Sequence, residues 1–132
     1  MGVEPSASLG WPRKRRIKQG RDFARVKAQG QRVVSGCVIA NWLPLPEGSA
    51  SRVGVVTGRK LGGAVVRNRA RRLLRESFRV HQHQLRQPLD LVLVARASIV
   101  GKPFGKVEAD YLAALRQADL LAHAEERMPK EE

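Results

Sequence analysis

The sequence predicts a single domain of the α+β class. The chain has 132 residues, of which 42% are hydrophobic, and this is enough for one buried core but not for two. Stretches with helical periodicity alternate with short runs rich in β-branched residues, which is typical of a mixed fold. In the middle of the chain a strand, a long helix and another strand follow one another, and this is the order of a βαβ unit.

The N-terminal segment is predicted to be irregular and basic. Residues 1–12 are rich in Gly, Pro, Ser and Ala, so we expect a disordered lead-in before a single domain that spans residues 13–123. The domain begins with a run of cations, which is typical either of a solvated tail or of a basic arm that grips phosphates. The run consists of Arg13, Lys14, Arg15 and Arg16.

The next segments predict a short helix followed by strands. Residues 21–29 place Phe23 and Val26 on one helical face, and a glycine follows where a helix would end. Residues 32–43 are rich in β-branched side chains and run into a loop that contains Pro and Gly. Residues 52–57 predict another strand, and we expect these two strand segments to pair in antiparallel fashion.

The stretch of residues 62–79 is the most unusual part of the chain. Its hydrophobic residues recur at spacings of three, four and one, which is the period of a helix. At about 100° per residue, Asn68 and most of the interleaved arginines occupy an arc of about 140°, away from the apolar stripe. The six arginines of the stretch are Arg67, Arg69, Arg71, Arg72, Arg75 and Arg79.

The arginines on this side of the helix form a cationic stripe, and this excess of positive charge predicts a negatively charged partner. Like charges one helical turn apart destabilise an isolated helix, and Glu76 is the one acid in the stretch. A merely solvated helix face normally mixes the two signs of charge. Because arginine forms paired hydrogen bonds with phosphates and stacks on bases, the pattern indicates a polyanion surface as the partner.

The C-terminal half predicts a strand and a last helix. The basic helix is expected to continue to about residue 86 and to stop before Pro88. Residues 90–96 form a continuous apolar run, which is typical of a buried central strand. Residues 106–123 have the spacing of an amphipathic helix, and residues 124–132 are expected to form a charged, frayed tail.

Charge narrows the class of partner. The chain has 25 Lys and Arg against 12 Asp and Glu, a formal net charge of +13, which points first to nucleic acid and second to an anionic membrane surface. The sequence has no long apolar segment, and this weighs against a membrane. Cys37 stands alone in an apolar run and is expected to be buried. The first residues lack the apolar core of a secretory signal, so we expect a cytoplasmic protein.

Catalysis by side chains of this chain is not predicted. Residues 58–63 resemble a phosphate-binding loop, but Ala64 stands where a lysine is needed. His81 and His83 are two positions apart and point to different sides of a helix, so we expect no metal on the protein. The aspartates that could act as acids or bases lie in different predicted elements. These are Asp22, Asp90, Asp110 and Asp119.

The order of these segments resembles a known family. From about residue 14 to residue 120 the chain resembles the protein subunit of bacterial ribonuclease P. The resemblance rests on KRRI near the N-terminus, on RVGVVTGRKLGGAVVRNRARRLLRESFR and on DLVLVAR. Its most specific part is Arg67-Asn68-Arg69, with Ala-Val-Val before it and Arg-Arg-Leu after it.

The resemblance implies a fold and an activity. The fold would be an α-β-β-β-α-β-α two-layer sandwich with a left-handed βαβ crossover at the basic helix, against the usual right-handed rule. The chain would be the RNA-binding subunit of an endonuclease ribonucleoprotein, in which a catalytic RNA removes the 5′ leader from precursor tRNA. Its partners would be that RNA and precursor tRNA, with no small-molecule substrate. Mg²⁺ would be held mainly by the RNA. A structural RNA-binding protein of ribosomal type, with no role in tRNA processing, is the alternative.

The resemblance also assigns residues. The basic residues of the long helix and those just before it would contact the catalytic RNA: Arg59, Lys60, Arg67, Asn68, Arg69, Arg71, Arg72 and Arg75. The leader would pass through a cleft between the first helix and the sheet, beside Phe23, with Arg13–Arg16 as a basic arm.

The chain departs from the family pattern at that cleft. Lys27 stands where the family often has a second aromatic residue, and it would grip a phosphate instead of a base. Asn41 stands where an aromatic residue of the strand is expected, with Trp42 beside it on the opposite face. Gly63 replaces a frequent asparagine ahead of the basic helix. The RNA-docking helix is unaffected by these departures, which concern the surface for the leader.

Overall fold

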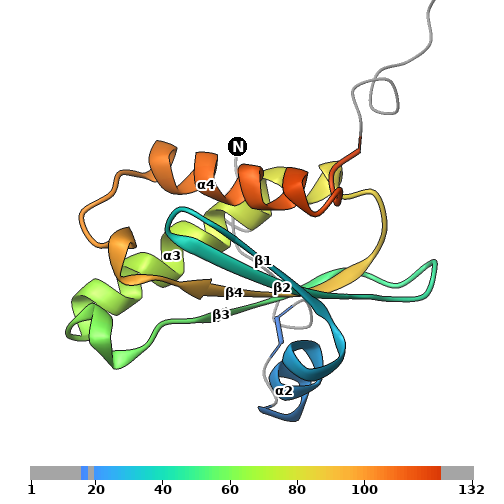
Figure 1. Ribbon diagram of the computed structural model, residues 1–132, viewed down its shortest axis with the longest axis horizontal. Coiled ribbons are helices and arrows are strands. Elements are labelled where there is room, and N and C mark those ends of the chain that lie inside the picture. Colours follow the sequence, from blue (N-terminus) through green and yellow to red (C-terminus); the bar gives the residue numbers. More distant parts are fainter. Residues whose placement is uncertain (1–15, 18–19, 123–132) are drawn as a thin grey trace, which may run out of the picture.

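The fold is known from a computed structural model that describes residues 16–17 and 20–122 (Figure 1). The predicted order of a helix, three strands, a helix, a strand and a helix is confirmed. In chain order the elements are α2 (Gly20–Gln29), β1 (Gln31–Ser35), β2 (Val38–Pro44), β3 (Arg52–Val56), α3 (Ala64–His81), β4 (Leu89–Ala95) and α4 (Phe104–Gln117). The predicted lead-in and tail lie outside the described residues, as do Arg13, Lys14 and Arg15 of the predicted basic arm.

The four strands form one mixed sheet in the order β1-β2-β4-β3. The predicted βαβ unit is present, because β3 and β4 are parallel neighbours joined through α3. The predicted antiparallel pairing of segments 32–43 and 52–57 is wrong. The first segment folds back on itself at Gly36, whose φ of +54° suits a tight turn, and β4 then lies between β2 and β3. The left-handed sense of the crossover stays a prediction.

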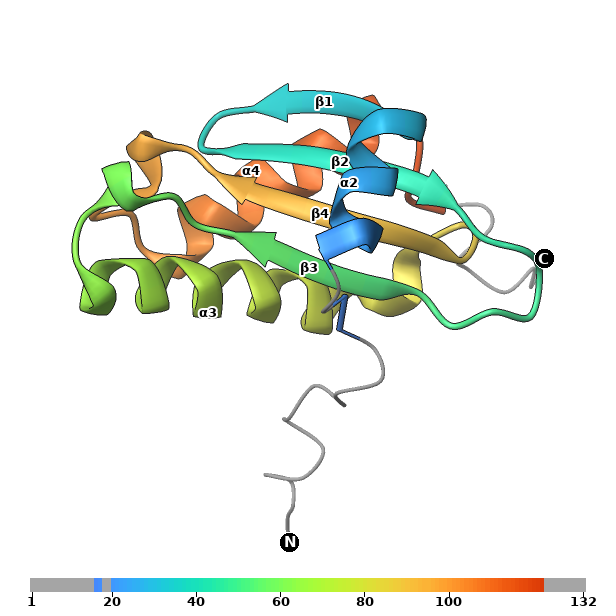
Figure 2. The ribbon, with the colours of Figure 1, turned by 90° about the horizontal axis from the view of Figure 1, so that it is seen from below.

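Helices cover both faces of the sheet (Figure 1). The main hydrophobic core lies between the sheet and the pair α3 and α4, and it contains Leu89, Leu91 and Leu93 of β4. Asp90 and Val92, which alternate with these leucines, face α2, and Val92 packs with Val26 of that helix. This alternation along β4 explains why its sequence is a continuous apolar run, since both faces of the strand are buried. Seen from below, α2 crosses the strands from β3 towards β1 (Figure 2).

Helix α3 turns its apolar stripe inwards, as predicted. Ala70, Leu74 and Phe78 are buried in the main core, where α3 contacts β3, β4 and α4. In the described part of the chain, no helix is both long enough and apolar enough to cross a membrane.

Helices α3 and α4 both end earlier than the periodicity predicts. A 3₁₀ turn at Gln82–Gln84 follows α3, and the chain then forms an antiparallel bridge between Leu85 and Leu121. The N–H of Arg86 donates to the carbonyl of Leu120 at 2.9 Å. The bridge and this hydrogen bond pair backbone N–H and C=O groups of the two segments with each other. The segments therefore do not need further helical turns to satisfy these groups.

We expect Leu74→Ala to destabilise the domain by about 2–5 kcal/mol, because it leaves a cavity in the core beneath α3. Val65→Ala on the same helix is the matched control. Its side chain is exposed, so it should change the free energy of unfolding by less than about 0.5 kcal/mol. Urea unfolding of the two variants measures the difference, and equal losses would show that the apolar stripe of α3 has been placed on the wrong side.

Candidate nucleic-acid interface

The outer side of α3 carries guanidinium groups that acids do not neutralise. Within the described chain, Arg79 is the arginine of α3 that has a carboxylate partner, Glu76, with 3.0 Å between Nε and Oε1. The hydrogen bond from Arg79 lowers the pKa of Glu76 below its usual value. Arg72 and Asn68 are exposed to solvent on the same helix. The charges of the other arginines are therefore available to an external anion.

Two of these arginines are held in place by neutral oxygen atoms. Arg71 donates from Nη1 to Oγ1 of Thr57 and from Nη2 to Oδ1 of Asn68, both at 2.7 Å. Arg69 donates from Nη2 to the carbonyl of Lys102 at 2.8 Å. These bonds orient the guanidinium groups and leave their charge intact, which is the arrangement that favours recognition of phosphate groups.

The basic surface continues in front of the helix. Arg59 and Lys60 lie exposed on a 3₁₀ turn, Arg59–Leu61, which the buried side chain of Leu61 fixes to the main core. Arg67 is half-buried on the first turns of α3, and its Nε has no hydrogen-bond partner. The fold therefore brings the predicted RNA-contacting residues before α3 next to those on its first turns.

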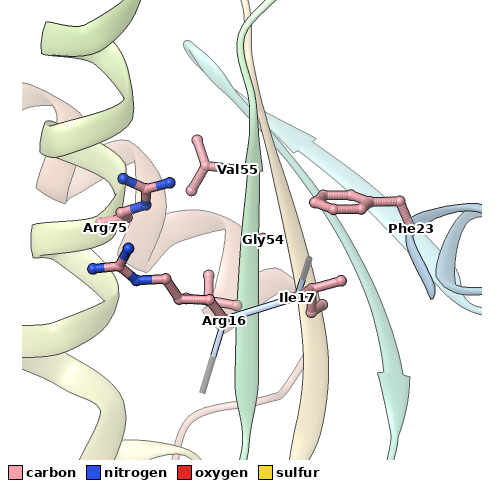
Figure 3. A pocket seen from close by; sticks show the side chains of 7 residues that line it. Arg16, Ile17, Phe23, Gly54, Val55 and Arg75 are labelled. Carbon is pink, nitrogen blue, oxygen red and sulfur yellow. The ribbon is translucent and has the colours of Figure 1, made fainter. Parts of the chain in front are cut away.

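Further along α3, Arg75 meets Arg16 from the N-terminal segment (Figure 3). The N–H of Ile17 donates to the carbonyl of Val53 at 2.9 Å, which holds this segment against the edge strand β3. Burial lowers the pKa of Arg75, and the nearby charges of Arg16 and Arg71 lower it further. Like charges gathered in this way favour an anion between them.

Arg16 and Arg75 belong to a pocket of about 270 Å³ at the edge of the sheet. The pocket also contains Phe23, which lies on the other side of β3 from Arg75 (Figure 3). A Cβ atom placed on Gly54 of β3 would lie 2.6 Å from Cε1 of Phe23, so only a glycine lets the ring lie this close to the strand. Sequence reasoning missed Gly54, although an isolated glycine inside a strand pattern is the signal for such an approach.

A second hollow, of about 290 Å³, lies over β2 and the end of β4 and is lined by Lys27, Arg32 and Asn41. Lys27 follows Phe23 by four residues, so both side chains project from one side of α2. Asn41 is buried on this face, while Trp42 belongs to the main core on the other face, as the sequence predicted. Arg32 was missed, because its position beside Asn41 depends on the β1–β2 register.

The opposite side of α2 is fixed by an ion-pair cluster of two aspartates and two arginines. Asp90 of β4 is fully buried and accepts from Nε and Nη2 of Arg52 at 2.9 and 2.7 Å. Arg25 of α2 donates to the same carboxylate at 3.3 Å. Asp22 lies 3.6 Å from Arg25 and 3.7 Å from Arg52. These contacts fix α2 to the sheet and thereby set the position of Phe23 and Lys27.

Two carboxylates of α4, those of Asp110 and Glu108, also make structural contacts. Burial opposes the ionisation of Asp110, but hydrogen bonds from Cys37 and the charge of Lys102 outweigh it and hold its pKa below the usual value. Its Oδ2 accepts from the backbone N–H of Cys37 at 3.0 Å. His81 contacts Glu108 of α4, with 2.7 Å between Nε2 and Oε2, while His83 is exposed. Residues 16–17 and 20–122 contain no group of three potential metal-binding side chains.

Comparisons with known proteins agree on one family. A family model described as ribonuclease P matches residues 11–119. The ribonuclease P protein component of Symbiobacterium thermophilum is 38% identical over 106 residues, which cover 80% of this chain and 92% of that protein. The component from Syntrophomonas wolfei is 36% identical, with 83% of this chain and 92% of that protein covered.

Solved structures show the same likeness. The ribonuclease P protein of Staphylococcus aureus superposes with a TM-score of 0.74 at 27% identity, covering 81% of this chain and 97% of that one. The protein from Thermotoga maritima gives a TM-score of 0.69 at 26% identity, with 77% and 96% covered.

We expect Asp90→Ala to destabilise the domain by about 3 kcal/mol, because it leaves Arg25 and Arg52 facing each other without a buried counter-ion. Glu47→Ala, which removes an exposed carboxylate from the loop between β2 and β3, is the control and should cost less than about 1 kcal/mol. Urea unfolding measures both. A loss for Asp90→Ala no larger than that of the control would show that the cluster does not hold α2 to the sheet.

Proposed function

The chain belongs to the ribonuclease P protein family, and on this premise we propose how its surfaces divide the work of that ribonucleoprotein. The protein binds the catalytic RNA on one side and the 5′ leader of precursor tRNA on another. It thereby assists the RNA in removing the leader. The observation that carries this proposal is the row of arginines from Arg67 to Arg75 on α3, which no acid among the described residues neutralises, together with the groove beside α2.

The docking surface for the catalytic RNA is α3 and the turn before it. RNA phosphates supply the negative charge that this surface lacks, and arginine can pair with them through two hydrogen bonds. The geometry that supports this assignment is the orientation of Arg69 and Arg71 by neutral oxygens. The proposed contacts are Arg59, Lys60, Arg67, Asn68, Arg69, Arg71, Arg72 and Arg75.

The leader follows the side of α2 that carries Phe23 and Lys27. A single strand binds through stacking of bases and contact with phosphates, and these two residues offer one of each. Arg16 adds a cation at the β3 end of this path and Arg32 adds one at the β1 end. Arg13, Lys14 and Arg15 precede Arg16 in the sequence and extend the basic arm in this proposal.

The chemical step belongs to the RNA subunit in this proposal, with Mg²⁺ held mainly by that RNA. The carboxylates near the leader path fit poorly as metal ligands or general bases, because guanidinium groups already surround Asp90 and Asp22. What the chain contributes is positioning of the two RNAs. We place this work in the cytoplasm, which is consistent with the unpaired, buried thiol of Cys37.

Reconstitution with a bacterial ribonuclease P RNA tests the proposal. We expect no cleavage of precursor tRNA by the protein alone, and cleavage by RNA plus protein at a lower Mg²⁺ concentration than by RNA alone. The double variant Arg71→Ala/Arg72→Ala is the control for docking and should lose the effect of the protein. Cleavage by the protein alone would contradict the proposal. A protein without influence on the RNA would also contradict it, and this second result would favour the ribosomal-type alternative.

The leader path has its own test. Phe23→Ala should weaken binding of leader-bearing precursor tRNA to the holoenzyme by about tenfold, because one base loses its stacking partner. Binding of tRNA that lacks a leader should not change. Phe104→Ala, on α4, removes an aromatic ring from the other face of the sheet and should affect neither substrate. Equal weakening with and without the leader would place Phe23 outside the leader path.

A further inference from the structure

Two exposed hydrophobic side chains border one notch beside the RNA-docking helix. In the described chain the large hydrophobic residues that remain strongly exposed are Val34, Val65 and Val100, with 42%, 83% and 49% of their surface accessible. Val65 lies on the first turn of α3, and Val100 lies in the turn that follows β4. Both contribute to the same notch, while Val34 lies on the edge strand β1.

The notch is small and mostly apolar. Its volume is about 170 Å³, well below the range typical of sites for drug-sized ligands, so it suits a single ring system better than a larger molecule. Ala70 and Ile99, which are buried, lie at its base. Arg69 forms a wall, and its guanidinium group is held there by the hydrogen bond to the carbonyl of Lys102.

The surroundings indicate which kind of molecule fills the notch. Val65 lies one helical turn before Asn68 and Arg69 on the same side of α3, so a polyanion bound to these residues also passes over Val65. Val65 contributes little to the core, and a β-branched side chain does not favour a first helical turn, so the fold alone does not account for it. Proteins recognise RNA largely through unstacked bases, which pack on apolar side chains and on guanidinium planes.

We propose that the notch receives one unstacked nucleobase of the RNA that docks on α3. The inference rests on the proposed function, because it takes that RNA as the bound partner. The base packs between Val65 and Val100 against the guanidinium plane of Arg69, while the neighbouring arginines hold phosphates of the same strand. Phosphate contacts carry no information on the base sequence, so a seated base would add a contact that depends on one particular unpaired nucleotide.

The first experiment compares Val65→Ser with Val34→Ser, a matched change at an exposed valine on the opposite edge of the sheet. Affinity for a bacterial ribonuclease P RNA is measured over a range of salt concentrations. Val65→Ser should bind about tenfold more weakly at every salt concentration, because apolar contact is lost while no cation is removed. Arg72→Ala, in contrast, should reduce the slope of log affinity against log salt by about 0.9.

The outcomes separate this inference from the proposed function. If the wild-type protein does not bind the RNA, the proposed function fails. If the wild type binds and Val65→Ser binds as tightly as Val34→Ser, the proposed function survives and the base site is wrong. A smaller salt slope for Val65→Ser would also overturn the base site, because it would mean that the change had disturbed phosphate contacts.

The second experiment identifies the nucleotide. Burial raises the pKa of the Cys37 thiol to about 11, so the variant Val65→Cys can be labelled selectively at position 65 with a photoreactive group. Crosslinks to the same RNA should concentrate on one or two unpaired nucleotides, and Val34→Cys should give none there. An abasic residue at that nucleotide should weaken binding of the wild type, and Val65→Ser should add nothing further. Crosslinks spread over paired regions, or between two copies of the protein, would refute the base site.

Discussion

The contact between the apolar stripe of α3 and the sheet determines the direction of every other side chain on that helix. Once Leu74 and Phe78 are buried against β3, β4 and α4, the arginines at the intervening positions must face outwards or along the edges of the helix. Like charges on one side destabilise the helix, and an isolated helix with this sequence would be poorly stable. Packing against the core offsets this repulsion. The arrangement of these arginines therefore depends on a hydrophobic contact on the opposite side of the helix.

A different kind of contact positions α2. Asp90 is buried between Arg52 and Arg25, and this cluster directs the opposite side of α2, with Phe23, towards the open part of the sheet. The groove and the cationic helix meet at the edge strand β3, where Arg16 and Phe23 line one pocket with Arg75 (Figure 3). The strand β3 thus separates Arg75, on the α3 side, from Phe23, on the α2 side, so the surfaces that we propose for the catalytic RNA and for the leader lie close together.

Local patterns in the sequence predicted the helices and most of the strands. Features that depend on contacts between distant segments were not predicted. The basic helix follows from a periodicity that neighbouring residues define, whereas the position of β4 between β2 and β3 depends on pairing across the whole chain. The end of α3 was predicted too late because the bridge of Leu85 to Leu121 lies outside any local window. The cleft at Phe23 was predicted from the family resemblance alone. Gly54, which lies against Phe23, was missed, although an isolated glycine inside a strand pattern indicates such a close approach.

Acidic residues have a distinct place in this basic protein. Asp90 and Asp110 stabilise contacts between elements, the first between α2 and the sheet and the second between α4 and the β1–β2 turn. Glu76 neutralises Arg79 near the end of α3, and the turns before it, which hold Arg67 to Arg75, have no acid of their own. This separation explains how a chain with a net charge of +13 folds around internal ion pairs while one face of α3 keeps its positive charge. In our proposal phosphate contacts supply affinity there, and the apolar notch at Val65 adds a place for one unstacked base.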